Sequence, residues 1–480
     1  MRISEKMGLK KSKLELDFFD YEFNKDNYAF LDPYYISKKE DDFLMECNEY
    51  IETFFNRFLF LLKTDEDKAY DIFSHLGEVN EICLGMSEGS PSGNGIGKID
   101  TKKIFKAIKE SDAFQNESAK RIEDVRLFIE GIDKDKISDM VANIIKYPLI
   151  KYTQDQCKLL NVPLVSIEAG YWWDKDKWVR GHQEMLVLDD KPYLLYPKNL
   201  VTDAKRYSAM EYFKIYILQY LQEKHIAENS ELVRKTYNRD GTVKRIYVYK
   251  KDIEKDFEKK GVEITKDWIA RFTKENPEVF RKFKQSTITK ISGMVTDEVT
   301  PTEIEEIIET LKNELIKIPV GSKDATKYHH LISGILELLF YPYVAHPRIE
   351  DEIHEGRKRI DITFSNIAEK GFFYLLGTSY NIPCQLIMVE CKNYSKDIAN
   401  PELDQIAGRF SAKRGKFGII CCRSVDHEDL FVEREKDTFK DDRGCIIHLT
   451  DKDIIELLDL RKNNITVDSF MTKKYNEIIK

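Results

Sequence analysis

The sequence predicts an α/β unit in its C-terminal part, with a central mixed sheet flanked by helices, preceded by a mainly helical α+β N-terminal region. Two observations lead to this fold class. Residues 43–62 and 209–221 carry apolar side chains at helical spacing, and only short strand-like runs lie between them. After about residue 320, strongly apolar strand-like runs alternate with helical segments. Strands this apolar require helices on both faces of their sheet.

Breaks in the pattern divide the chain into three predicted parts. Residues 1–225 are the N-terminal α+β domain, for which we expect a role in sensing or target recognition. Residues 226–318 are strongly charged, and an Asp-Gly turn at Asp240 precedes an alternating run, which predicts a charged helical connector with a small basic hairpin. Pro319 then interrupts the pattern, so the C-terminal unit is predicted to cover residues 319–480.

Four apolar runs in the C-terminal unit are predicted to be strands. The most apolar of them, residues 385–392, is typical of a strand that is buried on both faces. The predicted strands in chain order are 359–364, 385–392, 417–422 and 445–449.

The helices around these strands are predicted from periodicity and from capping residues. An apolar stripe predicts a helix over 324–340. Asn400 followed by Pro401 is typical of an N-cap with proline at the first helical position, and Thr450 is a further N-cap. An acidic and basic run predicts one more helix near 427–440.

Composition and charge limit the class of protein. A net charge of −8 argues against a protein that coats nucleic acid without specificity. The same net charge is compatible with an acidic, metal-binding site that basic clusters flank. The sequence contains no apolar stretch of the roughly 18 residues that a membrane span needs, and its start lacks the apolar core of a signal peptide, so we expect a cytoplasmic protein without membrane contact. Its eight cysteines have no regular spacing, which favours buried free thiols.

Three charged residues in the predicted strands form the candidate centre. Glu390 and Lys392 are two positions apart on a buried strand, so they point to the same face, and buried charges must be paired or bound to metal. Asp361 lies on the preceding strand, between Ile360 and Ile362. If the two strands are neighbours, Asp361 and Glu390 converge on one divalent ion.

This arrangement suits phosphodiester hydrolysis. A hard cation on carboxylate ligands lowers the pKa of a bound water and offsets charge in the transition state. Lys392 is predicted to lie beside the attacking water or the scissile phosphate. Glu337 on the opening helix is a candidate third metal ligand, and Gln405 is a candidate for orienting the water or a phosphate oxygen.

These residues resemble the PD-(D/E)XK nuclease superfamily and, within it, the Mrr-like restriction endonucleases. The resemblance covers about 140 residues and is carried by Glu337, Asp361, Glu390, Lys392 and Gln405. It implies a restriction-endonuclease-like fold and cleavage of DNA that depends on Mg²⁺, for which Mn²⁺ can substitute. It also implies Asp361 and Glu390 as metal ligands and Lys392 as the catalytic lysine.

The chain departs from the family pattern in two places. Ile360 stands where the family name has proline, and 28 residues separate Asp361 from Glu390, so we interpret 367–383 as an insertion that shapes the cleft or a subunit contact.

The predicted protein is a DNA endonuclease, which the resemblance places in defence against phage or foreign DNA. We expect a homo-oligomer, since two strands need two active sites, and a partner protein of a defence system is a further expectation. Two alternatives stay open: a module that binds nucleic acid or another protein without cutting, and a regulated effector nuclease within a multi-protein defence complex.

Other charged residues have ordinary explanations. Asp361, Glu390 and Lys392 would also fit a structural ion pair at a strand end. Arg409, one turn after Gln405, shares its face and is a candidate for the same phosphate, with a solvated surface as the alternative. His329, His330 and His354 lack a carboxylate at ligand spacing and are therefore not predicted to be general bases.

Overall fold

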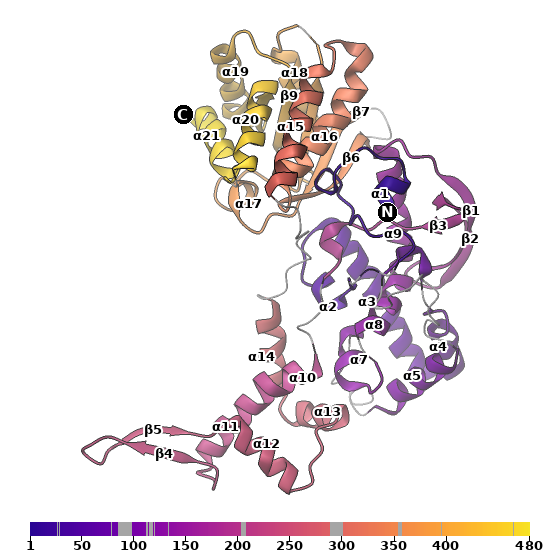
Figure 1. Ribbon diagram of the computed structural model, residues 1–480, viewed down its shortest axis with the longest axis vertical. Helices are drawn as coiled ribbons and strands as arrows, with labels where there is room; N and C mark the ends of the chain where they lie inside the picture. Colours follow the sequence, from indigo (N-terminus) through magenta and orange to yellow (C-terminus); the bar gives the residue numbers. More distant parts are fainter. Residues whose placement is uncertain are drawn as a thin grey trace.

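The structure is a computed structural model (Figure 1). It describes residues 1–25, 27, 29–77, 79–84, 98–111, 114, 119, 121–132, 134–202, 208–288, 301–353, 358–394, 396–463 and 465–480.

The N-terminal region combines many helices with one small antiparallel sheet, as predicted. Its longest helix, α3, is capped by Asp41, whose carboxylate accepts hydrogen bonds from the backbone of Phe43 and Leu44. The buried face of α3, with Phe54 and Phe58, lies at the centre of the larger apolar core. The elements are α1 (Ile3–Lys6), η1 (Lys13–Glu15), α2 (Pro33–Ile36), α3 (Asp42–Thr64), α4 (Glu66–Phe73), η2 (Asn80–Ile82), α5 (Lys98–Glu110), α7 (Ile122–Phe128), α8 (Lys134–Ile144), α9 (Lys146–Leu159), β1 (Val165–Trp173), β2 (Trp178–Leu188), β3 (Lys191–Tyr193) and η3 (Lys198–Leu200).

The predicted connector is not a detached linker. Ile253, Ile269 and Phe283 from its helices are buried in the same core as Phe54, because each of these helices has its own apolar face. The predicted hairpin is confirmed and projects from the lower end of the molecule in Figure 1. The elements are α10 (Ala209–Glu211), the π-helix η4 (Tyr212–Ile217), α11 (Leu218–Ala227), β4 (Arg234–Tyr237), β5 (Val243–Tyr247), α12 (Lys250–Lys259), α13 (Lys266–Glu275) and α14 (Pro277–Ile288).

The C-terminal unit contains a five-stranded mixed sheet between helices, which confirms that part of the prediction. The strand order is β10-β9-β8-β7-β6, with β7 antiparallel to both β6 and β8, and with β8, β9 and β10 parallel. The elements are α15 (Pro301–Lys317), η5 (Ser322–Asp324), α16 (Ala325–Phe340), β6 (Val344–Ile353), β7 (Lys358–Asn366), α17 (Gly371–Thr378), β8 (Leu386–Lys392), α18 (Asn400–Ala407), β9 (Phe417–Cys422), α19 (Glu428–Lys440), β10 (Cys445–Thr450), α20 (Asp451–Lys462) and α21 (Asp468–Ile479).

Two apolar clusters cover the two faces of this sheet. On one face, Ile387 and Val389 of β8 pack with residues of α15, α16 and α20. On the other face, Met388 packs with Leu403 and Ile406 of α18 and with residues of α19. The alternation of neighbouring side chains along β8 thus places Glu390 and Lys392 on the α18 side, as the period of a strand requires.

Three features of the C-terminal unit differ from the sequence-based expectation. Helix α15, expected in the connector, buries Ile308, Leu311 and Leu315 in the C-terminal core. Helix α17 lies within the expected insertion and buries its own apolar face in the same core. The edge strand β6 was not predicted, because it contains Pro347 and a run of acidic residues. Such residues are tolerated at the edge of a sheet, where β6 lies.

The predictions for cysteines and membrane spans can also be compared with the structure. All eight cysteines are free and buried, as expected. Within the described ranges, no helix combines the length and the apolar character needed to cross a bilayer.

Candidate functional site

Strands β7 and β8 bring Asp361 and Glu390 together. The two strands are antiparallel neighbours, and their ladder runs from the pair Ser365 and Leu386 to the pair Ile362 and Val389. The next position on each strand is Asp361 and Glu390. There the Asp361 carboxylate accepts a hydrogen bond from the backbone N–H of Cys391 at 2.9 Å. A side-chain acceptor thus replaces the backbone carbonyl of the neighbouring strand where the ladder ends.

Glu390 is the most buried member of the site, with 0% of its surface exposed. Its Oε2 accepts a hydrogen bond from Gln405 Nε2 at 2.8 Å and lies 3.4 Å from Lys392 Nζ. Its Oε1 lies 2.8 Å from Arg409 Nη1. Burial and the neighbouring Asp361 carboxylate raise the pKa of Glu390 to about 7, although Arg409 and Lys392 oppose the shift. The site therefore holds a carboxylate in an environment that opposes its negative charge.

The side chains of Lys392 and Gln405 are hydrogen-bonded to each other. Lys392 Nζ donates to Gln405 Oε1 at 2.9 Å, and Gln405 projects from α18. The helix begins at Asn400 as predicted, but its N-cap is Ala399 and not Asn400, so Pro401 is the second helical residue. Arg409 lies just beyond the end of α18, and its side chain and that of Gln405 point the same way, since each lies 2.8 Å from a Glu390 oxygen. We call these residues the strand-end cluster: Asp361, Glu390, Lys392, Gln405 and Arg409.

His329 is a neighbour of the strand-end cluster that sequence reasoning did not select. Its Nε2 lies 3.9 Å from Asp361 Oδ2, across the contact between α16 and β7. Residues 329 and 361 are far apart in sequence, so only the packing of the helix on the sheet reveals the pair. His330 contacts Asn161 instead, at 3.1 Å, and His354 lies outside the described residues.

The structure does not bring Glu337 to this cluster. Its carboxylate lies 3.8 Å from Lys198 Nζ and faces Asp17 and His346. His346 neighbours Ala345, which pairs with Ser365, four positions along β7 from Asp361 and thus roughly 13 Å away. Glu337 comes two turns after His329 on α16, which carries it toward the other end of β7.

Glu337 belongs to a buried group of charges between the N-terminal and C-terminal units. His346 Nε2 lies 2.9 Å from Asp41 Oδ1, and the His346 backbone N–H donates to Asp17 Oδ1 at 2.9 Å. The two aspartates and Lys198 come from the N-terminal region, and Glu337 and His346 from the C-terminal one. We call these residues the junction cluster: Asp17, Asp41, Lys198, Glu337 and His346.

The donor set at the strand ends suits a hard cation held by two carboxylates. Among the described residues, no group of three or more His, Cys, Asp and Glu side chains is placed to hold a metal ion. Glu390 Oε1 is buried and faces the Arg409 guanidinium at 2.8 Å, so a metal ion bound to this oxygen would share it with Arg409 or displace Arg409 from it. Mg²⁺ is commonly held by one or two carboxylates, with water and phosphate oxygens completing its octahedron. Asp361 and Glu390 fit that pattern, and Glu337 is not needed for it.

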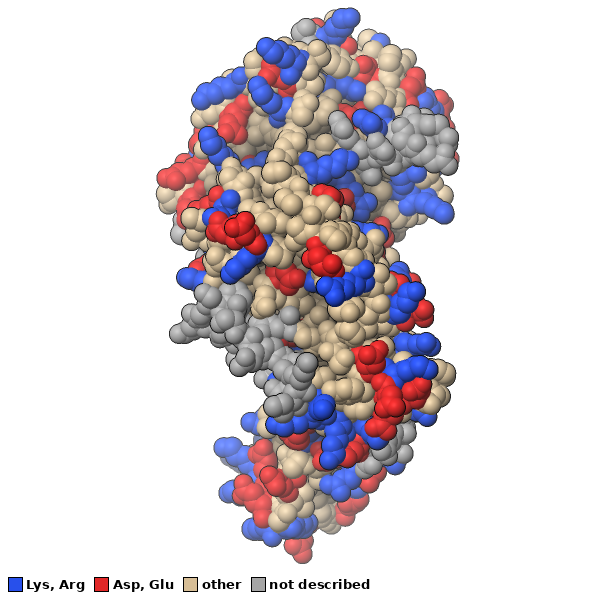
Figure 2. All heavy atoms as spheres, turned by 90° about the vertical axis from the view of Figure 1, so that its right-hand side faces the viewer, with Lys and Arg blue, Asp and Glu red and all other residues tan. Residues whose placement is uncertain are grey.

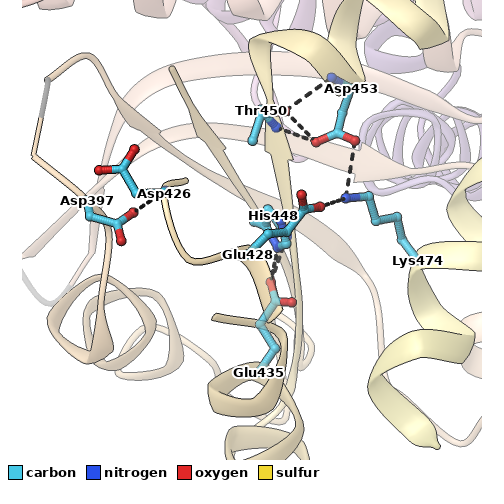
Figure 3. A network of polar contacts seen from close by, with 8 residues as sticks. All are labelled: Asp397, Asp426, Glu428, Glu435, His448, Thr450, Asp453 and Lys474. Carbon is cyan, nitrogen blue, oxygen red and sulfur yellow. Dashed lines mark hydrogen bonds and ion pairs between the residues drawn. The ribbon is translucent and has the colours of Figure 1, made fainter. Parts of the chain in front are cut away.

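A second polar network in the C-terminal unit has a structural role (Figure 3). Nδ1 of the buried His448 on β10 lies 2.9 Å from Glu435 Oε1, and the His448 backbone N–H donates to the same oxygen at 2.8 Å. Lys474 of α21 lies 3.4 Å from Glu428 and 3.2 Å from Asp453. The network therefore connects α19, β10, α20 and α21. It lies at the β10 edge of the sheet, which β9 and β8 separate from β7.

Comparisons with known proteins concern mainly the N-terminal part. A family model described as a domain of unknown function (DUF8370) matches residues 8–208. This stretch includes Asp17, Asp41 and Lys198 of the junction cluster, but it ends before the C-terminal unit begins. No curated protein and no solved structure matches the chain. The strand-end cluster must therefore be interpreted from its own chemistry.

Proposed function

We propose that the C-terminal unit is a metal-dependent endonuclease that hydrolyses phosphodiester bonds in DNA. The observation that carries this proposal is the convergence of two carboxylates, a lysine and a glutamine where the pairing of β7 with β8 ends. Glu390, Lys392 and Gln405 are joined by contacts of 2.8 to 3.4 Å, and Asp361 accepts a hydrogen bond from the neighbouring backbone N–H of Cys391 at 2.9 Å. A lone structural ion pair would require neither the glutamine nor the second carboxylate.

Asp361 and Glu390 would hold one Mg²⁺ ion, for which Mn²⁺ could substitute. When bound, such an ion lowers the pKa of a water molecule and offsets charge on the phosphate. Binding would also relieve the repulsion between the two carboxylates, which contributes to the raised pKa of Glu390.

Lys392 is held ready for an anionic group. Its side chain is 11% exposed, and its ammonium contacts Gln405 and Glu390. A phosphate oxygen is a stronger partner for an ammonium than a neutral amide is, so Lys392 can transfer from Gln405 to the substrate. Gln405 then has its amide oxygen free to accept from the attacking water, while its Nε2 still donates to Glu390.

The fold gives further support to the proposal. Helix α16, the antiparallel strands β6 to β8, helix α18 and the parallel strand β9 follow one another as a mixed sheet flanked by helices. That arrangement is compatible with a restriction-endonuclease-like fold. A cytoplasmic role in defence against foreign DNA, a homo-oligomer and a defence-system partner belong to the same proposal.

The test is cleavage of plasmid DNA by the full chain with Mg²⁺ or Mn²⁺. We expect loss of cleavage by at least about 100-fold in Asp361→Ala, Glu390→Ala and Lys392→Ala, because each removes charge from the reacting centre. Lys416→Ala is a matched control, since its exposed ion pair with Asp442 lies outside the cluster. If the wild type cuts no better than the three variants, the catalytic proposal fails.

The alternative is a module that binds nucleic acid or protein without cutting, or an effector nuclease that acts only within a complex. The buried junction cluster favours the second form, because it joins the N-terminal region to the C-terminal unit through desolvated charges. Cleavage that appears only after a ligand or partner of the N-terminal region is added would identify the regulated form.

A further inference from the structure

The β4–β5 ribbon projects from the molecule, with β5 in contact with α11 (residues 234–247 in Figure 1). All four residues of β4 are exposed, as are four of the five residues of β5. Such an isolated ribbon buries no apolar face, so its side chains are not needed to fill the core. They are available to a partner.

The ribbon and its flanks carry a strong positive charge. Residues 234–251 contain seven Lys and Arg against one Asp, a net charge of +6 in a chain whose net charge is −8. Lys235, Lys244 and Arg245 have no carboxylate within ion-pair distance in the described part of the chain, whereas Arg234 is held by Asp252 at 2.7 Å. By contrast, basic and acidic side chains are interspersed over the face drawn in Figure 2.

One face of the ribbon combines arginine with aromatic rings. The pairs Arg234 with Tyr247 and Thr236 with Arg245 lie opposite each other and so share a face. The Arg245 guanidinium lies 5.4 Å from the Tyr247 ring, and the Arg234 guanidinium lies 5.1 Å from the ring of Tyr249. These contacts hold long cationic side chains in place, which lowers the entropy lost on binding.

The turn at the tip is rigid. Asp240 accepts hydrogen bonds from the backbone N–H of Thr242 at 3.0 Å and from its hydroxyl at 2.6 Å. Gly241 has φ +83°, a left-handed conformation that favours glycine. Asn238 closes the turn through Thr242, since its backbone N–H donates to the Thr242 carbonyl at 2.8 Å. The ribbon is thus formed before any partner arrives.

We propose that the β4–β5 ribbon is a docking arm for double-stranded DNA. The positive charge of the ribbon is complementary to a polyanion. The choice of DNA as that polyanion rests on the proposed function. A two-stranded β-ribbon fits the major groove of B-form DNA, whereas the narrow major groove of A-form RNA does not admit side chains. In Figure 1 the ribbon lies at the opposite end of the molecule from the C-terminal sheet, so it contributes to binding rather than to the reacting centre.

The experiment measures binding of a labelled DNA duplex to the full chain, with EDTA present and Asp361→Asn in every sample to prevent cleavage. The test variant combines Lys235→Gln, Lys244→Gln and Arg245→Gln. The matched control combines Lys102→Gln, Lys103→Gln and Lys191→Gln, three exposed lysines on α5 and β3 that change the net charge equally.

We expect the ribbon variant to bind on the order of tenfold more weakly at low salt, and the slope of log affinity against log salt to fall by about 2 to 3, since each lost phosphate contact removes about 0.9. The control should stay within about twofold of the parent. Equal losses in both variants, or no loss in the ribbon variant, would overturn the proposal. Thermal unfolding checks that both variants are folded.

Three further readouts separate this proposal from others. Equal, ribbon-dependent binding of an RNA duplex of the same sequence contradicts the choice of DNA. A changed oligomeric mass in the ribbon variant, with DNA binding intact, identifies the ribbon as a contact between copies of the chain. Ribbon-dependent DNA binding by a wild-type chain that cuts no DNA supports the docking arm while the nuclease proposal fails.

Discussion

The strand-end cluster and the junction cluster contain the same kinds of side chain in different surroundings. Both combine two or more carboxylates with cationic groups, and in both burial raises the pKa of a glutamate, Glu390 to about 7 and Glu337 to about 8. Their exposure separates them. The side chains of Asp361 and Lys392 are 23% and 11% exposed, whereas those of Glu337 and Lys198 are 1% and 2% exposed.

This difference in exposure shows that a shifted pKa alone does not identify an active site. The junction cluster joins two units, and its Glu337 and Lys198 are enclosed by protein, so a substrate cannot reach them. The strand-end cluster is partly exposed at Asp361 and Lys392, and the buried Glu390 lies directly beside them. Chemistry requires such access together with the charges.

The largest expected effect is on stability, from His346→Ala in the junction cluster. The substitution leaves Asp41 and Asp17 buried without their shared cationic partner, and breaking a buried pair in this way costs about 3–5 kcal/mol. We expect the free energy of unfolding, measured in denaturant, to fall by that amount. His182→Ala, at an exposed position on β2, should change it by less than about 0.5 kcal/mol. A loss below about 1 kcal/mol for His346→Ala would show that the junction is solvated.

The next largest effect is the dependence of the free energy of unfolding on pH, because Glu337 binds its proton more tightly in the folded chain than in the unfolded chain. Burial and Asp17 raise its pKa from 4.5 to about 8, so its contribution to stability is present below pH 4.5 and is lost as pH rises toward 8. His346 acts in the same direction: burial lowers its pKa, but Asp41 and Asp17 raise it from 6.5 to about 10, and its contribution is lost between those values.

Glu337→Gln isolates the part that Glu337 contributes. The amide cannot ionise, so between pH 5 and 7 the variant should lose less stability than the wild type, by about 1 kcal/mol per pH unit. Denaturant titrations at several pH values measure both slopes. Parallel slopes for wild type and variant would mean that Glu337 is ionised in the folded chain and that the junction is more polar than its contacts indicate.

The two clusters also differ in how far the sequence could predict them. Strand alternation and an apolar run were enough to place Glu390 and Lys392 on one face, because this is a local pattern along β8. Asp361 was expected beside them only if its strand was a neighbour, a condition that the pairing of β7 with β8 meets. Glu337 illustrates the limit. A glutamate on the opening helix can face either end of the sheet, and its place depends on Lys198 and Asp17, more than 100 residues away in sequence.

The fold shows the same division. The four apolar strands were predictable from their period, and the helix after Thr450 from its N-cap, whereas the N-cap expected at Asn400 lies one residue earlier, at Ala399. The position of α15 was not, because its amphipathic pattern indicates a helix without indicating which core receives Leu311. Likewise, His329 has no motif of its own, and only the packing of α16 against β7 brings it near Asp361.

The smallest expected effect concerns Arg409, which distinguishes a charge-balancing role from substrate binding. Its guanidinium lies 2.8 Å from Glu390 Oε1, where it would compete with a metal ion for the same carboxylate. If it only balances charge, Arg409→Gln should lower the Mg²⁺ concentration for half-maximal cleavage by about threefold, since a nearby positive charge is removed. The measurement belongs at pH 8.5, well above the pKa of Glu390 of about 7, so that protons do not compete. A rise in KM for DNA with an unchanged Mg²⁺ requirement would instead assign Arg409 to the phosphate. Either result adds a feature that the junction cluster lacks, a cation whose partner changes when the site is occupied.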